Sequence, residues 1–359
     1  MSVAGRRIAV LRALPGVGDL LCAVPALRAI RTGHPAATIM LVGLPSAWWF
    51  VHRYPDLVDA LLPVAGVAGL PEVEPDAVRA VRFLRRAQAE HFDLAVQIHG
   101  SGEVTNPLMT LLGARHHASA HRPGQWVPPG ASIEYPDRGH EIDRMLAVVA
   151  AAGCPHVGVG VDLRVTADEH RTAARLVERA GLVGRQLACI HPGASRPDRR
   201  WPAERFADVG DHLADRGFAV VATGTTRERP GVRAVAHRMR SRLLDLSGHT
   251  SIGVLGAVYG RARLVVTNDT GASHVAAAVG APSVVVIGSA EPDRWAPLDR
   301  QRHRAVSGAP PGAWPGADAV ITAVDDQLGR WPPARGRLDR ARAGRAHGAA
   351  GTRPSGEGS

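Results

Sequence analysis

The sequence predicts an α/β protein with two doubly wound parallel sheets that face each other across a cleft. The first observation is length: 359 residues are too many for one typical core and comfortable for two domains. The second is that short apolar runs alternate with helical patterns along most of the chain. The third is that this alternation pauses over 155–166 and restarts near residue 185. We therefore predict one domain over 1–160 and a second over 161–330.

The first half of the chain reads as buried strands joined by helices. A strand at 6–12 leads through a glycine-bearing turn into a helix that reaches residue 31, and Pro25 is expected to end or kink the first part of that helix. A strand at 37–43 completes one βαβ unit. The remaining predicted elements are strands at 58–64 and 92–100, a helix at 75–92 between them, and a helix at 140–153 that ends at a glycine.

The second half repeats the alternation. A helix at 168–181 comes first, and the segment 264–288 reads as strand, polar turn, small helix and strand. The other predicted strands are at 186–193, 218–224 and 243–248, and the other predicted helices are at 202–217, 229–241, up to about 260, and near 318–328. The tail at 335–359 carries six arginines against two acidic residues and little apolar content, so it is predicted to be disordered.

Charge and cysteine usage narrow the class of function. The net charge is +10 and the isoelectric point is near 10.9. This balance suits an anionic ligand or a membrane surface, and no zinc-finger, RNP-type or basic-zipper pattern indicates nucleic acid. The three cysteines, Cys22, Cys154 and Cys189, are too widely spaced for a disulfide framework or a zinc site. No apolar run reaches the ~18 residues of a membrane span. These features predict a cytoplasmic protein.

Polar residues gather where predicted strands of the second half end, the edge at which open α/β sheets bind ligands. Asp269, Thr270 and Gly271 follow a strand and open a helix, and His274 lies about one turn further on. The free N–H groups and partial positive charge of a helix start suit a phosphate. The alternative is that Asp269 only caps the helix while His274 packs locally.

Two more strand-end loops have the same double interpretation. In "HPGASRPDRRWPAERF" (191–206), Ser195 belongs to a small loop able to wrap a phosphate, and Arg199 and Arg200 offer charge. The alternative is a loop before a proline-started helix with incidental arginines. In "TGTTRERP" (223–230), Glu228 could accept hydrogen bonds from ribose hydroxyls, or could be a carboxylate favoured by the helix dipole.

The first half contributes one carboxylate to the predicted cleft. Asp19 follows the first strand in "LPGVGDLLCAVPALRAI", where it is either a base or an N-cap. Gly18 belongs to a glycine pair without the third glycine of a dinucleotide fingerprint, and the chain has no lysine for a Walker P-loop. We also place His99 and Asn106 in a strand-end loop that faces the cleft.

Three histidines in the same half, His116, His117 and His121, lie close together in the sequence, as metal ligands can. They lack helical spacing and a carboxylate partner, so we predict that they are exposed on the surface and that no metal is bound there.

The segments "GDLLCAVPALRAIR", "HPGAS…RRWPAERFA" and "NDTGASHVAAAVGAPSVVVIG…EPDRWAP" resemble glycosyltransferase family 9, the ADP-heptose–lipopolysaccharide heptosyltransferases and their relatives. The resemblance covers roughly residues 6 to 328. It implies the GT-B fold, two Rossmann-like domains with the donor site in the second. It also implies inverting transfer from a nucleotide-diphosphate sugar, ADP-linked in the best-known members, to a cell-envelope glycan or lipid-linked acceptor, without a bound metal or other cofactor.

The resemblance also assigns roles to residues. Asp19 matches the general base of the family, and Arg199 stands where the family often has lysine, which replaces a point donor by a planar fork. The residues that match donor-binding positions are Ser195, Glu228, Asp269, Thr270, Gly271 and His274. Position alone makes Gly18, His99 and Asn106 candidates for the acceptor side.

Other functions fit parts of this pattern. A sugar-nucleotide epimerase on the same fold would bind its sugar nucleotide in the second domain in a similar way but would need no acceptor pocket. A non-catalytic sugar-nucleotide binding protein would not need Asp19. A nucleic-acid binder driven by the basic tail is the third alternative. For a transferase, the lipid-linked acceptor would place the protein at the inner surface of the membrane.

Overall fold

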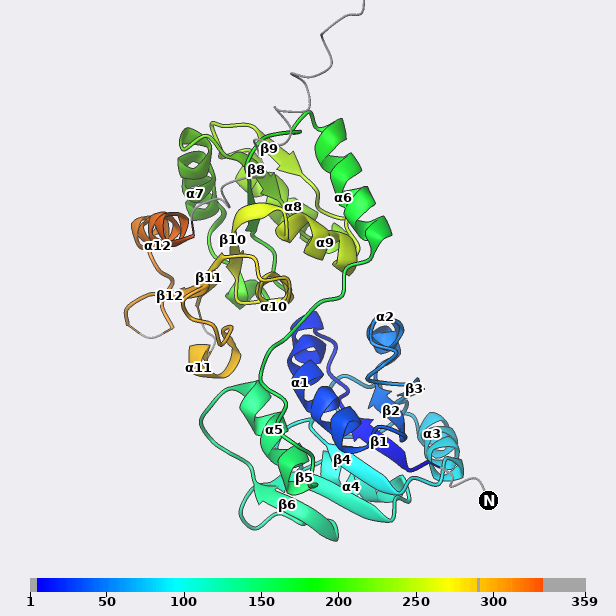
Figure 1. The fold of residues 1–359 in the computed structure, drawn as a ribbon. Helices are drawn as coiled ribbons and strands as arrows, with labels where there is room; N and C mark the ends of the chain where they lie inside the picture. The colour runs from blue at the N-terminus through cyan, green and yellow to red at the C-terminus, as the bar shows by residue number, and fades with distance from the viewer. Residues whose placement is uncertain (1–4, 289–290, 311, 332–359) are drawn as a thin grey trace, which may run out of the picture.

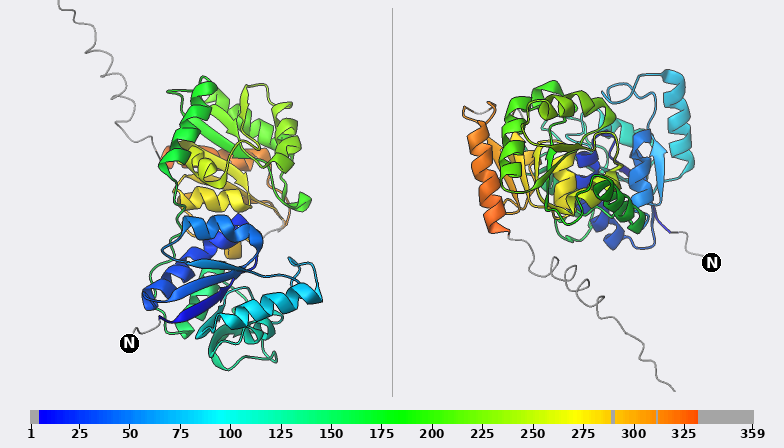
Figure 2. Two further views of the ribbon diagram at one scale, coloured as in Figure 1. Left: turned by 90° about the vertical axis from the view of Figure 1, so that its right-hand side faces the viewer. Right: turned by 90° about the horizontal axis from the view of Figure 1, so that it is seen from above.

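Each half of the chain forms one six-stranded parallel sheet. The computed structural model describes residues 5–288, 291–310 and 312–331. The strand order is β3-β2-β1-β4-β5-β6 in one sheet and β12-β11-β10-β7-β8-β9 in the other. In both sheets the chain builds three strands outward, returns past the first strand and builds three more on its other side. The two lobes that result are stacked one on the other (Figures 1 and 2), and the predicted doubly wound architecture is confirmed.

The first lobe contains two strands that the sequence did not reveal. They are β5 (His116–His121), where polar and small residues hide the pattern, and the half-exposed β6 (Gly130–Glu134). The helix α1 (Val17–Gly33) runs through Pro25 without a break, because apolar side chains on both sides of the proline are buried. The other elements are β1 (Arg7–Leu11), β2 (Thr38–Gly43), α2 (Trp48–Arg53), β3 (Ala60–Pro63), α3 (Ala77–Ala89), β4 (Leu94–Gln97), α4 (Thr105–Leu111) and α5 (Glu141–Ala151).

The second lobe follows the predicted alternation more closely, with β12 (His303–Ser307) as its unpredicted strand. Its elements up to β10 are α6 (Ala167–Arg179), β7 (Leu187–His191), α7 (Ala203–Asp215), β8 (Ala219–Ala222), α8 (Arg229–Ala236), β9 (Leu243–Asp245), α9 (Ile252–Tyr259) and β10 (Ala262–Asn268). The rest are α10 (Gly271–Ala278), β11 (Ser283–Ile287), α11 (Pro292–Trp295) and α12 (Ala317–Arg330). The basic tail lies outside the described residues.

The lobes meet through the helices that follow the central strands. α1 leaves β1, α10 leaves β10, and the two helices pack against each other between the sheets (Figure 1). One hydrophobic cluster accordingly continues from the first lobe into the second. Ion pairs add to this contact at one side, where Arg53 lies 2.6 Å from Glu169. The limits 1–160 and 161–330 for the two domains stay a prediction.

The topology puts the ligand-binding edges of both sheets at the same place. In a doubly wound sheet the ligand crevice opens where the strand order reverses. That point lies between β1 and β4 in the first sheet and between β7 and β10 in the second. Both points open toward the junction of α1 and α10. Within the described residues no helix is long and apolar enough to cross a membrane.

Candidate active site between the two sheets

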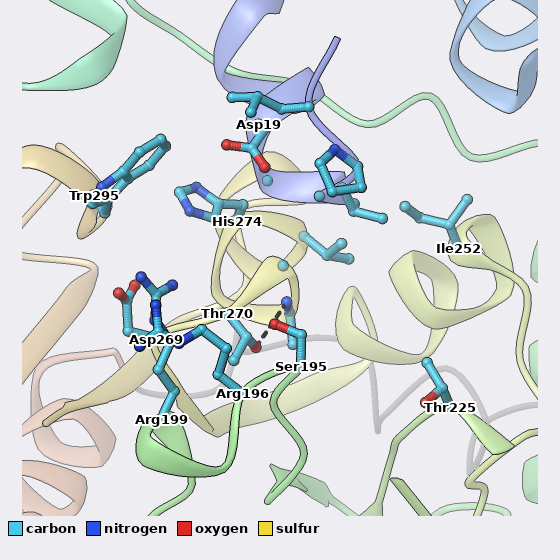
Figure 3. A pocket seen from close by; sticks show the side chains of 18 of the residues that line it. Asp19, Ser195, Arg196, Arg199, Thr225, Ile252, Asp269, Thr270, His274 and Trp295 are labelled. Atoms are coloured by element: carbon cyan, nitrogen blue, oxygen red, sulfur yellow. Dashed lines mark hydrogen bonds between the residues drawn. The ribbon is translucent and has the colours of Figure 1, made fainter. Parts of the chain in front are cut away.

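A cavity of about 920 Å³ lies between the lobes, and both contribute to its wall. Its size is that of a pocket for a small organic ligand. The first lobe supplies the turn after β1 and residues beyond β4, while the second supplies the ends of β7, β8 and β10 with α11. In Figure 3, Asp19 enters from one side, and Ser195, Arg199 and Thr270 enter from the other.

Asp19 is the third residue of α1 and not its N-cap, which is Gly16. Its carboxylate accepts a hydrogen bond from the backbone N–H of Gly16 and lies 3.7 Å from the Nη2 atom of Arg12. Burial raises the pKa of Asp19 above its usual value, although Arg12 opposes the shift. A buried carboxylate with a raised pKa is a better proton acceptor than an exposed one.

The turn after β10 holds Thr270 as the N-cap of α10. The Oγ1 atom of Thr270 accepts a hydrogen bond from the N–H of Ala272 at 3.3 Å, so the interpretation of Asp269 as the cap is wrong. Asp269 is buried at the cavity wall. Burial raises the pKa of Asp269 above its usual value, although Arg199 opposes the shift. The hydroxyl hydrogen of Thr270 stays available, because capping uses only a lone pair of its oxygen.

Asn268, which sequence reasoning missed, connects the loop after β7 to the turn after β10 by hydrogen bonds. Its Nδ2 donates to the carbonyl oxygens of Pro192 at 2.9 Å and Gly193 at 3.2 Å. Its Oδ1 accepts from the N–H of Trp201 at 3.1 Å. The buried amide therefore holds the loop after β7 against the turn after β10. Its place directly before Asp-Thr-Gly was the available sequence signal.

The loop after β7 sends Ser195, Arg196 and Arg199 into the cavity wall (Figure 3). Arg200, which the sequence also offered, instead donates from Nε to the carbonyl oxygen of Ala194 at 2.9 Å and does not line the cavity. Arg196 is paired with Asp198 at 2.7 Å. Arg199 and the N-terminal end of α10 give this wall the positive charge that an anionic leaving group requires.

Glu228 serves as a structural carboxylate and also faces the cavity. Its Oε2 accepts from the N–H of Thr225 at 2.7 Å, completing a capping box with that threonine. The side chain lies 3.9 Å from Nε2 of His191 and lines the cavity. A Cβ at position 193 would overlap the Glu228 carboxyl, which explains Gly193. Both interpretations from the sequence are therefore compatible with the geometry.

His274 packs against Gly18 at the junction of the two lobes. The imidazole packs directly on the Cα of Gly18, and its Nδ1 lies 3.5 Å from the Sγ of Cys22. Burial lowers the pKa of His274 to about 4, so the ring is neutral at pH 7. His274 also lines the cavity below Asp19 (Figure 3).

Of the other two candidates for the acceptor side, His99 faces the cavity and Asn106 does not. His99 lines the cavity, and its Nδ1 accepts from the N–H of Ala13 at 3.0 Å, which leaves Nε2 as the proton-bearing nitrogen. Burial lowers the pKa of His99 to about 4. Asn106 does not face the cleft. It lies in α4, fully buried, and donates to the carbonyl oxygen of Ala120 at 3.0 Å, because α4 turns it toward β5.

The three histidines of the first lobe are not a surface group. They fall on β5, an interior strand of the sheet, and His117 is only 7% exposed. His116, at the start of the strand, is exposed and His121, at its end, is half-buried. In the described part of the chain no group of three or more His, Cys, Asp or Glu side chains is placed to hold a metal ion.

Sequence reasoning also missed charged residues beside Asp19. Arg12 and Glu141 form a buried ion pair in the first lobe, and Arg294 reaches Glu141 from the second. All three line the cavity. The available signal for Arg12 was a charge at the end of an otherwise apolar strand. Glu141 and Arg294 had no signal, because their partners lie 129 and 153 residues away along the chain.

Comparison with known proteins agrees with the predicted family and fold. The model of glycosyltransferase family 9 (heptosyltransferase) matches residues 80–312. Lipopolysaccharide heptosyltransferase 3 of Escherichia coli K12 is 24% identical over 78% of this chain and 82% of that protein. Over shorter stretches identity reaches 30%, and there this chain spans only 33 to 40% of the curated relatives that it matches.

Two solved structures show the same fold. The family 9 glycosyl transferase of Veillonella parvula superimposes with a TM-score of 0.76 at 22% identity, over 91% of this chain and 98% of that one. The E. coli heptosyltransferase WaaC with ADP gives 0.64 at 18% identity, over 89% and 99%. The two parallel sheets are those of GT-B heptosyltransferases.

Proposed function

The chain belongs to glycosyltransferase family 9 (heptosyltransferase), and we propose that it transfers a sugar, a heptose or a relative of it, from an ADP-linked donor to a glycan of the lipopolysaccharide core. The relatives named lipopolysaccharide heptosyltransferases support the acceptor class, and the E. coli structure with ADP supports the donor class. A lipid-linked acceptor would be met at the cytoplasmic face of the membrane.

One observation carries the proposal. Asp19 from the first lobe and the Thr270–Gly271 end of α10 from the second line the same cavity. A transferase needs a base for the acceptor on one side and a diphosphate site on the other. A sugar-nucleotide binding protein would need only the second lobe, so the raised pKa of Asp19 would have no use there.

The proposed mechanism follows from these positions. Asp19 takes the proton of the acceptor hydroxyl as that oxygen attacks the anomeric carbon. The new bond forms opposite the bond to the diphosphate, which breaks and leaves its electron pair on the phosphate oxygen, so the configuration inverts. The end of α10, the Thr270 hydroxyl, Ser195 and Arg199 stabilise the charge of the departing diphosphate.

The direct test is a screen of nucleotide sugars by thermal shift, followed by product analysis. A donor present at 100 times its Kd should stabilise the protein by roughly 2.7 kcal/mol. Turnover should require both donor and acceptor. A new sugar nucleotide that forms from donor alone would instead identify an epimerase, and stabilisation without turnover with any glycan acceptor would favour a binding protein.

We predict that turnover needs no divalent metal. The reason is that Arg199 and the start of α10 already place positive charge where the diphosphate would lie. Activity measured in EDTA should equal activity in Mg²⁺ or Mn²⁺. Loss of turnover in EDTA with recovery on metal addition would contradict the prediction.

We predict that the Thr270 hydroxyl contributes to donor affinity. Thr270→Ala removes the hydroxyl, whereas Thr270→Ser keeps a hydroxyl that can cap α10 and donate. Donor affinity measured by calorimetry should fall about tenfold in Thr270→Ala, the value of one charge-assisted hydrogen bond, and stay near the parent value in Thr270→Ser. Asp269→Ala should weaken donor binding as well. Parent-like affinity in both alanine variants would show that this turn is not the donor site.

A further inference from the structure

Arg12 is a buried guanidinium shared between two carboxylates. Its side chain is fully buried. Nη1 donates to Oε1 of Glu141 at 2.9 Å and to the carbonyl oxygen of Ile98 at 2.7 Å, while Nε donates to the carbonyl oxygen of Asp19 at 3.3 Å. Nη2 has no hydrogen-bond partner within the described residues and faces the carboxylate of Asp19 at 3.7 Å. Arg12 is thus anchored by Glu141 and directed at Asp19.

Glu141 in turn receives an arginine from each lobe. Its Oε1 accepts from Arg12, which follows β1, and its Oε2 accepts from Nε of Arg294 in α11 at 3.0 Å. Arg294 Nη2 also donates to the hydroxyl of Tyr135 in the first lobe at 3.0 Å. The glutamate is 2% exposed, so it could not remain ionised without both partners. Although burial raises it, the two arginines bring the pKa of Glu141 below its usual value.

We propose that Glu141 is a positioning residue for the transfer reaction, which holds Arg12 against Asp19 and does so fully only when Arg294 of the second lobe is docked on it. This inference rests on the proposed function, in which Asp19 is the base. Contact between the lobes then sets the charge balance at Asp19 through a chain of three groups, Arg294, Glu141 and Arg12. The base is tuned when the donor lobe is in place.

Among the charged groups around Asp19, Arg12 and Glu141 have the largest effects on its pKa. Arg199 approaches from the loop after β7 and lowers the pKa of Asp19, but after Arg12 and Glu141 in the order of effect. The neighbouring histidines, His274 and His99, are neutral at pH 7 because burial lowers both of their pKa values.

Glu141→Gln tests the electrostatic part. The amide oxygen can still accept from Arg12, but the negative charge is gone, so Arg12 acts on Asp19 alone. The pKa of Asp19 should fall, because Glu141 no longer raises it while Arg12 still lowers it. This pKa is measured by carbon NMR titration of the Asp19 carboxyl, whose signal is assigned by its absence in Asp19→Asn. The acidic limb of the pH profile of kcat/KM is the second measurement. An unchanged Asp19 titration in Glu141→Gln would overturn the proposal. The NMR titration is valid even if no sugar is transferred, so failure of the proposed function is recognised separately.

A double-mutant cycle tests the connection between lobes. If Arg294 acts through Glu141, Arg294→Met should lower turnover in the parent background and have little further effect in Glu141→Gln. Arg53→Met is the matched control, because it breaks another ion pair between the lobes, that with Glu169, away from Asp19. Its effect should add to that of Glu141→Gln. An Arg294→Met effect that also adds would overturn the proposal.

A variant at the partly exposed Arg294 keeps the inference testable if Glu141→Gln does not fold. Arg294→Lys keeps a cation for Glu141 and should recover at least part of the turnover that Arg294→Met loses. Equal loss in the lysine and methionine variants would mean that Arg294 only packs at the junction, and would overturn the proposal.

Discussion

Asp19→Asn is expected to lower kcat by roughly 10² to 10⁴, the usual contribution of a general base. Asparagine keeps the shape of the side chain and can still accept the hydrogen bond from Gly16 N–H, but it cannot take a proton at neutral pH. The loss should appear in kcat, because the proton moves only in the transition state. Donor affinity, measured by calorimetry, should stay at the parent value, because the donor residues belong to the other lobe.

The same variant should be at least as stable as the parent at pH 7. The folded-state pKa of Asp19 is raised above 3.8, so the ionised carboxylate costs folding free energy at neutral pH. This cost is removed as the pH falls through the folded-state pKa and then below 3.8, where the carboxyl is protonated in both states. The stability difference between variant and parent, measured by urea unfolding, should therefore shrink over that interval. Activity and stability would change in opposite directions, which separates loss of a base from loss of structure.

Parent-like turnover in Asp19→Asn would mean that the base lies elsewhere. His99 also lines the cavity, but its Nδ1 already accepts from Ala13 and its Nε2 bears the proton. It is therefore better suited to donate a hydrogen bond into the cavity. The carboxylates Asp269 and Glu228 would be tested next. Collapse of donor binding in Asp19→Asn would instead contradict the division of labour between the lobes.

Local patterns in the sequence predicted most of the fold, since buried strands and amphipathic helices have recognisable periods. The strands β5, β6 and β12 escaped because their composition is polar or their burial is partial. The loops with Asp19, Ser195 and Thr270 could be found because strand ends in parallel sheets share one edge. Arg12, Glu141 and Arg294 could not be grouped, because their contact depends on how two lobes pack, which no local pattern encodes. Asn106 was misplaced for a related reason: the strand β5 that receives it was itself missed.

Gly18→Ala is expected to lower kcat/KM by at least 10² while both lobes stay folded. A Cβ at position 18 would lie closer than 3.0 Å to the buried His274 ring, so we expect α1 and α10 to separate. A displacement of about 1 Å between reacting groups costs on the order of 10² in rate. Each lobe keeps its own sheet, so circular dichroism should be unchanged while small-angle scattering shows a more open molecule. Gly231→Ala, in α8 with no atom within 4 Å of the new Cβ, is the matched control and should behave like the parent.

A second substitution decides whether the effect of Gly18→Ala comes from the His274 contact. In Gly18→Ala with His274→Ala, the space left by the imidazole accommodates the new methyl group, so the scattering profile should return to that of His274→Ala alone. If the double variant stays open, the methyl group acts by altering α1 itself. If Gly18→Ala is fully active and closed, the junction of α1 and α10 accommodates the methyl group without moving Asp19 relative to Thr270. The catalytic geometry then does not depend on this close packing.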